Sequence, residues 1–152
     1  MDKPIIDGVS IELLNTFSDE KGKVLHFIKS NAMSFDVFGE CYFSEINPNC
    51  VKAWKKHTKQ IQNITVPVGN IKVVLYDDRP KSFSKNKLQI FEIGRPNLYY
   101  RICIPPNVWH GFKCISRNPA LLANCANMIH DANENIVLPF NDNYIPLNWD
   151  EL

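Results

Sequence analysis

The chain has 152 residues, close to the usual size of one domain, so we expect a single domain spanning residues 1–152. Lysine and arginine total 17 and aspartate and glutamate total 16, and this balance favours neither nucleic acid nor a membrane as partner. The apolar runs are short and the amino terminus is polar, so we predict a cytoplasmic protein without a spanning helix or signal peptide. Five cysteines without a Cys-x-x-Cys pair argue against a disulfide framework and a structural zinc site.

Apolar residues occur in short runs rich in β-branched and aromatic side chains, each bounded by turn-forming residues. Gly69-Asn70 separates two of these runs, as a tight hairpin turn does, and residues 30–38 have a helical pattern too short for more than a connecting turn or two. Eight or more strands without a long helix predict an all-β sandwich, jelly roll or barrel. The predicted strands are residues 24–28, 41–46, 61–68, 71–76, 88–93, 99–104, 111–115 and 121–128.

Two segments have the spacing of the metal-binding hairpins of cupins, which are double-stranded β-helices or jelly rolls. Lys55-Lys56-His57, followed by Gln62, fits the first hairpin, and residues 105–110 fit the second. Lys55 and Gln62 stand where the cupin pattern has a histidine and a glutamate, and neither replaces those ligands around a cation. We therefore expect no metal, with His57 and His110 lining a metal-free pocket; a metal-dependent cupin is the weaker alternative.

Five motifs in register resemble the dTDP-4-dehydrorhamnose 3,5-epimerase family more closely than cupins in general. Together they cover roughly residues 10 to 150. The motifs are Phe-Ser-Asp-Glu-Lys-Gly at 17–22, Ala-Trp-Lys-Lys-His at 53–57, Tyr-Asp-Asp-Arg at 76–79, Ile-Pro-Pro-Asn-Val-Trp-His-Gly-Phe at 104–112, and the closing Asn-Asp and Ile-Pro-Leu-Asn-Trp within 141–149.

The resemblance implies a homodimeric, cupin-like jelly roll that binds a nucleotide-linked 4-keto-6-deoxy sugar and needs no metal or organic cofactor. It implies an epimerase or related isomerase that removes and returns a proton beside the ketone, on a pathway to a surface polysaccharide. His57 matches the family's catalytic base, and an imidazole has a pKa suited to that work, with a hydrogen-bonded barrel histidine as the alternative. The alternative class is a non-catalytic module that only binds a sugar or sugar nucleotide.

Three chemically important family positions differ in this sequence. Gln62 replaces the lysine that stabilises the enolate, so it brings no charge there. The family's acid tyrosine falls near Ala123 and Asn124, neither of which delivers a proton at neutral pH. The carboxylate that orients the base in relatives lies beyond the final tryptophan, so we expect this partner of His57 to be missing and another group to orient the ring.

Other side chains are candidates for the lost roles. Tyr42 lies on a strand expected to line the barrel, so its phenol is a candidate acid, with core packing as the alternative. His110 lies at the barrel mouth and is a candidate to polarise the ketone, unless the His-Gly-Phe turn is purely structural. His26 stands where the family often has a residue that reaches the partner subunit's site, and the alternative is a surface strand histidine.

Lysines surround His57 without an intervening acidic residue, at positions 52, 55, 56 and 59. Such a cluster fits either an exposed, soluble loop or a site for a pyrophosphate-bearing ligand, and Lys21 and Arg79 would add to its positive charge. We therefore predict catalytic roles for His57, His110 and Tyr42, and substrate contacts at Lys21, His26, Lys55, Gln62, Arg79 and Asn124.

Overall fold

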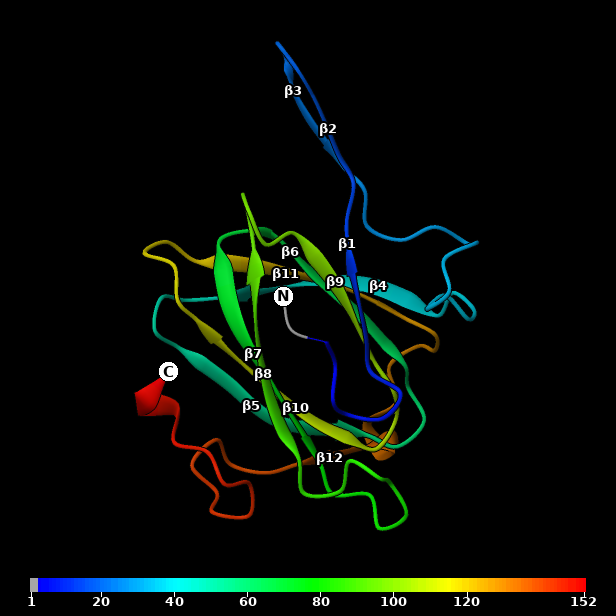
Figure 1. Ribbon diagram of the computed structural model, residues 1–152, viewed down its shortest axis with the longest axis vertical. Helices are drawn as coiled ribbons and strands as arrows, with labels where there is room; N and C mark the ends of the chain where they lie inside the picture. The colour runs from blue at the N-terminus through cyan, green and yellow to red at the C-terminus, as the bar shows by residue number, and fades with distance from the viewer. Residues whose placement is uncertain (1–2) are drawn as a thin grey trace.

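Two five-stranded sheets lie face to face in the computed structural model, which describes residues 3–152 (Figure 1). One sheet has the strand order β1-β9-β6-β11-β4 and the other β12-β5-β10-β7-β8, and neighbouring strands are antiparallel. This arrangement confirms the predicted all-β, cupin-type jelly roll. The strands are β1 (Ser10–Leu13), β2 (Thr16–Asp19), β3 (Gly22–Leu25), β4 (Glu40–Ile46), β5 (Val51–His57), β6 (Gln62–Val68), β7 (Asn70–Asp77), β8 (Leu88–Gly94), β9 (Tyr100–Ile104), β10 (Val108–Cys114), β11 (Ala120–Ala126) and β12 (Asn135–Val137).

The main core lies between the sheets, and a second apolar cluster covers one outer face. Along β7, Val73 and Leu75 belong to the main core, whereas Val74 belongs to the outer cluster. This division follows the alternation of side chains along a strand. Ile145 and Trp149 from the carboxyl-terminal segment complete the outer cluster. The carboxyl-terminal segment therefore holds the β12-β5-β10-β7-β8 sheet from outside.

Each predicted strand overlaps an observed one, although the run at 24–28 coincides with β3 only at its first two residues. Residues 30–38 contain turn hydrogen bonds and no helix, as predicted for a connecting segment. The apolar runs did not reveal β1, β2, β5 and β12. These strands are largely exposed or rich in lysine, so they lack the apolar alternation that identifies a half-buried strand.

The predicted hairpin at Gly69-Asn70 is wrong. β6 pairs with β9 and β11, whereas β7 pairs with β8 and β10, so the turn passes from one sheet to the other. Gly69 has φ +76, and a Cβ there would lie 2.8 Å from the Ala120 Cα atom. Glycine is required because the corner combines a left-handed backbone with close approach of a neighbouring strand.

Among residues 3–152 the only helices are two three-residue 3-10 turns, η1 (Ala132–Glu134) and η2 (Trp149–Glu151). Neither has the length or the apolar character needed to cross a membrane. The five cysteines are free thiols; Cys103, Cys114 and Cys125 are buried, while Cys41 and Cys50 are exposed.

Candidate active site

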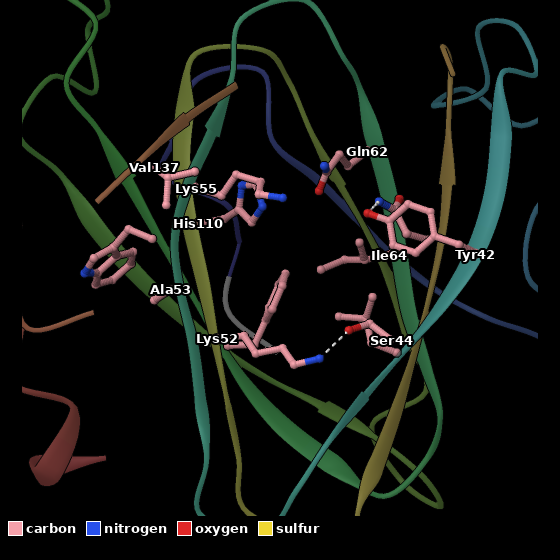
Figure 2. Close-up of a pocket in the computed structure, with 13 residues that line it drawn as sticks. Tyr42, Ser44, Lys52, Ala53, Lys55, Gln62, Ile64, His110 and Val137 are labelled. Atoms are coloured by element: carbon pink, nitrogen blue, oxygen red, sulfur yellow. Dashed lines mark hydrogen bonds between the residues drawn. The ribbon is translucent and has the colours of Figure 1, made fainter. Parts of the chain in front are cut away.

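A cavity of about 340 Å³ lies between the two sheets. Figure 2 shows that its two walls come from different sheets: Lys55 and His110 on β5 and β10 face Tyr42 and Gln62 on β4 and β6. A volume of this size is at the lower end of the range for small-molecule sites in proteins. Of the nine residues that the sequence predicted for the site, Tyr42, Lys55, Gln62, His110 and Asn124 line this cavity.

A β-bulge explains why two lysines of β5 face the cavity. His110 pairs with Lys55, and Phe112 pairs with Lys52. The two β5 residues between Lys52 and Lys55 therefore lie opposite the single β10 residue between His110 and Phe112. In a regular strand, residues three apart point to opposite faces, but the extra residue in a bulge changes this alternation. Lys52 and Lys55 therefore both line the cavity.

Gly111, the middle residue of the His-Gly-Phe motif, allows this close packing. A Cβ atom there would lie 2.5 Å from the Ala53 Cβ atom and 2.8 Å from the Trp149 ring. The glycine therefore has a structural role, and His110 beside it is free to line the cavity.

The four predicted lysines occupy different environments. Lys56 pairs with Asp78 at 2.7 Å and also lies over the Trp109 ring, 4.6 Å from its centroid. Neither Lys56 nor Lys59 is among the residues that line the cavity. The sequence cluster therefore separates into two lysines at the cavity and two away from it.

His57 lies at the end of β5 and contacts a carboxylate that the sequence did not reveal. Its Nδ1 pairs with Oε1 of Glu134 in η1, and both side chains are almost fully buried. The second oxygen, Oε2, accepts from the backbone N–H groups of Thr58 and Lys59, each at 3.1 Å, and of Gln60 at 3.3 Å. The carboxylate thus holds both the imidazole and the backbone that follows it.

His57 itself is not a lining residue, but its ring is parallel to that of His110, with centroids 5.7 Å apart and 8° between the planes. The Nε2 atom of His57 is buried and has no hydrogen-bond partner within residues 3–152. With Nδ1 directed at Glu134, this Nε2 is the nitrogen available to accept a proton.

The two imidazoles differ in proton affinity. Burial lowers the pKa of His110 to about 3, and the charges of His57 and Lys55 add to this effect. Burial also lowers the pKa of His57, but the hydrogen bond and charge of Glu134 oppose that decrease. At neutral pH His110 is therefore an uncharged hydrogen-bonding group, and His57 is the better base of the two.

Glu134 is ionised. Burial alone would raise its pKa, but the hydrogen bonds from His57 and from the Lys59 and Gln60 backbone, together with the His57 charge, outweigh burial and leave the pKa below its usual value. An ionised carboxylate at Nδ1 fixes the tautomer of the ring and stabilises the imidazolium that forms when Nε2 gains a proton.

Tyr42 on β4 and Asn124 on β11 are direct cross-strand partners, and Asn124 Nδ2 donates to the Tyr42 hydroxyl at 2.9 Å. Burial raises the pKa of Tyr42, an effect that the Asn124 hydrogen bond opposes and the Glu40 charge reinforces. The phenol is protonated at neutral pH, and since its oxygen accepts from Asn124, its own proton is free for a ligand.

Similar proteins identify the family. A dTDP sugar isomerase from Desulfovibrio desulfuricans G20 is 41% identical and matches 97% of this chain and 94% of its own, with a TM-score of 0.94. The probable low-salt glycan biosynthesis epimerase Agl13 of Haloferax volcanii is 35% identical over 130 residues, 84% of this chain and 83% of the relative. The chain belongs to the dTDP-4-dehydrorhamnose 3,5-epimerase family.

Other matches agree with this membership. The spore coat polysaccharide biosynthesis protein SpsL of Bacillus subtilis is 29% identical over 147 residues, 95% of this chain and 97% of the relative. The dTDP-6-deoxy-D-glucose-3,5-epimerase RmlC of Legionella pneumophila is 18% identical and shares the fold, with a TM-score of 0.84 over 97% of this chain and 81% of its own. No protein-family model matches the sequence.

The predicted loss of a carboxylate partner for His57 is wrong, because Glu134 pairs with its Nδ1 from within the fold. Glu134 is also the other group that was expected to orient the ring. No sequence signal placed it there, because 77 residues separate it from His57 and it reaches the imidazole only through the turn that leads into β12. The sequence around it, Asp-Ala-Asn-Glu, predicts only a turn.

Three predicted contacts lie outside the cavity. Arg79 donates from Nε and Nη2 to Asp77, each at 2.8 Å, and also to the Asp7 carbonyl at 2.7 Å, so its guanidinium serves a structural network. Lys21 lies in the turn of the arm formed by β2 and β3, which projects away from the sheets in Figure 1. His26 follows that arm and packs edge-on against Phe17, with centroids 5.4 Å apart.

Within the described part of the chain, no group of three or more His, Cys, Asp or Glu side chains is arranged to hold a metal ion. At the two positions where Lys55 and Gln62 depart from the cupin pattern, an ammonium and an amide line the cavity. This donor set does not fit a divalent cation.

Proposed function

We propose that the protein is a sugar-nucleotide epimerase that inverts a carbon beside the 4-keto group of a nucleoside-diphosphate 4-keto-6-deoxy sugar. The observation that carries this proposal is the placement of a His57–Glu134 pair beside one cavity wall and a protonated phenol, Tyr42, on the other. The relatives support a dTDP-linked substrate and a role in polysaccharide synthesis, since one is named as a dTDP sugar isomerase and others as glycan or spore coat polysaccharide biosynthesis proteins.

The reaction begins with a proton whose acidity the ketone increases. Nε2 of His57 takes the proton from the carbon beside the carbonyl, and the C–H electron pair moves to form the enolate. His110, uncharged at neutral pH, orients the keto sugar by a hydrogen bond from the cavity wall. Tyr42 then gives its hydroxyl proton to the opposite face of the same carbon, the ketone re-forms, and solvent returns the two side chains to their starting protonation states.

The placement of His57 and Tyr42 on opposite sides of the cavity favours inversion of the carbon over removal and return of the proton on the same face of the sugar. His57 is on β5, in the β12-β5-β10-β7-β8 sheet, and Tyr42 is on β4, in the other sheet. A flat enolate held between the sheets presents one face to each residue. Removal on one side and return on the other changes the configuration of the carbon.

Solvent exchange tests the proposed reaction directly. With wild-type protein in D2O, we expect deuterium at C3 or C5 of at least one member of a panel of 4-keto nucleotide sugars that carry thymidine, guanosine, cytidine or uridine, detected by mass spectrometry and proton NMR. Exchange is the sensitive readout because it reports proton removal even when net epimerisation is slow. Binding of one of these compounds without exchange would identify a binding module instead.

Tyr42→Phe should separate proton removal from inversion. The phenylalanine keeps the ring but has no proton to deliver, so we expect at least a 100-fold loss of epimerised product, within the range for general acid catalysis of about 10²- to 10⁴-fold, while exchange with retained configuration continues. Proton NMR of the reaction in D2O distinguishes the two products. If Tyr42→Phe epimerises at the wild-type rate, another group is the acid.

We also propose that the protein is a homodimer whose β2–β3 arm reaches the partner subunit. Phe17 and Val24 on this arm are each 61% exposed, and apolar side chains on a projecting arm favour a contact with another surface. Lys21 and His26 would then approach the cavity of the second copy. We expect the wild-type protein to sediment as a dimer and the Phe17→Glu, Val24→Glu variant as a folded monomer; a wild-type monomer at micromolar concentration would rule the arrangement out.

A further inference from the structure

We propose that Lys55 is the catalytic residue that stabilises the enolate, in place of the charge that Gln62 does not supply. The inference rests on the proposed epimerase function and assigns a different task to Lys55 from the phosphate contact suggested by its position in a lysine cluster. Four observations on the cavity support it.

The first observation is the position of Lys55. It pairs with His110 across β5 and β10, and its side chain lines the cavity. Its charge contributes to the lowered pKa values of both His57 and His110, so the ammonium lies close to both imidazoles. Figure 2 shows its amine extending from the His110 wall into the cavity, toward the wall that carries Gln62. This is the space in which a keto group beside the base would lie.

The second observation is that the other lining cation is already engaged. Lys52 Nζ donates to Ser44 Oγ at 2.9 Å and to the Glu45 carbonyl at 2.6 Å, so Lys52 ties β5 to β4. In contrast, no hydrogen bond or ion pair involves the Lys55 ammonium within residues 3–152.

The third observation concerns Gln62. Its Nε2 donates to Gln60 Oε1 at 3.0 Å, and its side chain is buried. An amide fixed in this way brings no positive charge to an oxyanion and has one donor already in use. Gln62 can therefore contact the sugar but cannot replace the family's cation.

The fourth observation is the absence of a countercharge on the cavity walls: within residues 3–152, no aspartate or glutamate lines the cavity. An ammonium in these surroundings interacts weakly with a neutral ketone and strongly with the negative oxygen that forms when the proton leaves. Such a difference between ground state and transition state lowers the reaction barrier. Lys55 thus donates a hydrogen bond to the enolate oxygen, no bond to nitrogen is formed or broken, and the contact weakens when the ketone returns.

Lys55→Met should lower the rate constant for solvent exchange by about 10²- to 10³-fold, the usual cost of losing one oxyanion donor. We expect the affinity for dTDP itself, measured by calorimetry, to change less than threefold, because dTDP has no keto group. Thermal unfolding should remain within a few degrees of wild type. Lys85→Met, which removes one charge from an exposed loop, is the matched control and should exchange at the wild-type rate.

Moving the charge provides a stricter test. In the Lys55→Met, Gln62→Lys double variant, an ammonium enters the cavity from the opposite wall. We expect its rate constant for solvent exchange to be at least tenfold higher than that of Lys55→Met. Recovery supports a requirement for charge at the keto oxygen, and no recovery in a double variant that folds and binds dTDP as wild type does counts against it.

Three results would overturn the proposal. If Lys55→Met exchanged at the wild-type rate, another group would stabilise the enolate, and the proposed function would survive. A loss of dTDP affinity equal to the loss of exchange would identify Lys55 as a pyrophosphate contact. Failure of the wild-type protein to exchange any compound would remove both the proposed function and the role of Lys55.

Discussion

His57→Asn should abolish solvent exchange, with a loss of about 10³-fold or more relative to wild type, because the amide nitrogen of asparagine does not accept a proton near neutral pH. Asparagine can still replace one hydrogen bond of the imidazole, so we expect the affinity for a 4-keto nucleotide sugar to fall only a few-fold. The measurement is the initial rate of deuterium incorporation with saturating substrate, together with calorimetric binding.

His130→Asn is the matched control for this substitution. His130 is exposed and does not line the cavity, and although its charge contributes to lowering the pKa of His57, its removal should leave the exchange rate at neutral pH unchanged. His110→Asn gives the informative contrast, because His110 lines the cavity but has a pKa of about 3. If His110→Asn abolished exchange while His57→Asn retained it, the base would be His110 and the function of the Glu134 pair would need another explanation.

Glu134→Gln should give the second largest loss, about 10²-fold or more in the rate constant for exchange, since a buried carboxylate that orients and stabilises an imidazolium contributes up to about 10⁴-fold in Ser-His-Asp triads. Glutamine can retain a hydrogen bond to Nδ1 but removes the negative charge. We therefore expect the carboxylate to act as a positioning residue whose effect passes through His57.

The pH dependence distinguishes this role from a purely structural one. In the proposed reaction, exchange requires neutral His57, so the exchange rate should rise with pH through the pKa of that residue. Glu134 opposes the lowering of the His57 pKa by burial. In Glu134→Gln this opposition is lost, the pKa falls, and the acidic limb of the rate profile should move to lower pH while the plateau decreases.

Glu92→Gln, at an exposed position on β8, is the control and should leave the profile unchanged. If Glu134→Gln lowered the plateau of the exchange rate but left the acidic limb of the pH profile at the same pH, the carboxylate would only maintain the fold.

The strands that pack on the core could be predicted from the sequence, because alternating apolar residues leave a pattern that a sheet requires. Val73 and Val74 show the limit of this reasoning: both are buried, one between the sheets and one under the carboxyl-terminal segment, and the sequence does not say which face is which. Gly69 shows a second limit. Its backbone freedom suits either a hairpin or a corner between sheets, and only the pairing of distant strands decides between them.

The candidate site was predictable where motif spacing places a residue on a strand, as for His57, His110 and Lys55. It was not predictable where a side chain reaches the site through contacts between distant segments. Glu134 is the main example, because its role depends on how a short turn docks against the backbone after His57. Arg79 is the opposite case, since its motif is present but Asp77 holds its guanidinium elsewhere.

The bulge in β5 also bears on how such pockets diverge. The direction in which Lys52 and Lys55 point depends on one additional residue opposite Gly111, so the charge of the cavity depends on strand register as well as on residue identity. A single insertion or deletion between Val51 and His57 would exchange inward and outward positions without changing any side chain. Related proteins can therefore acquire or lose a cavity cation through a length change in this strand, and an alignment that compares only residue types at fixed columns will overlook it.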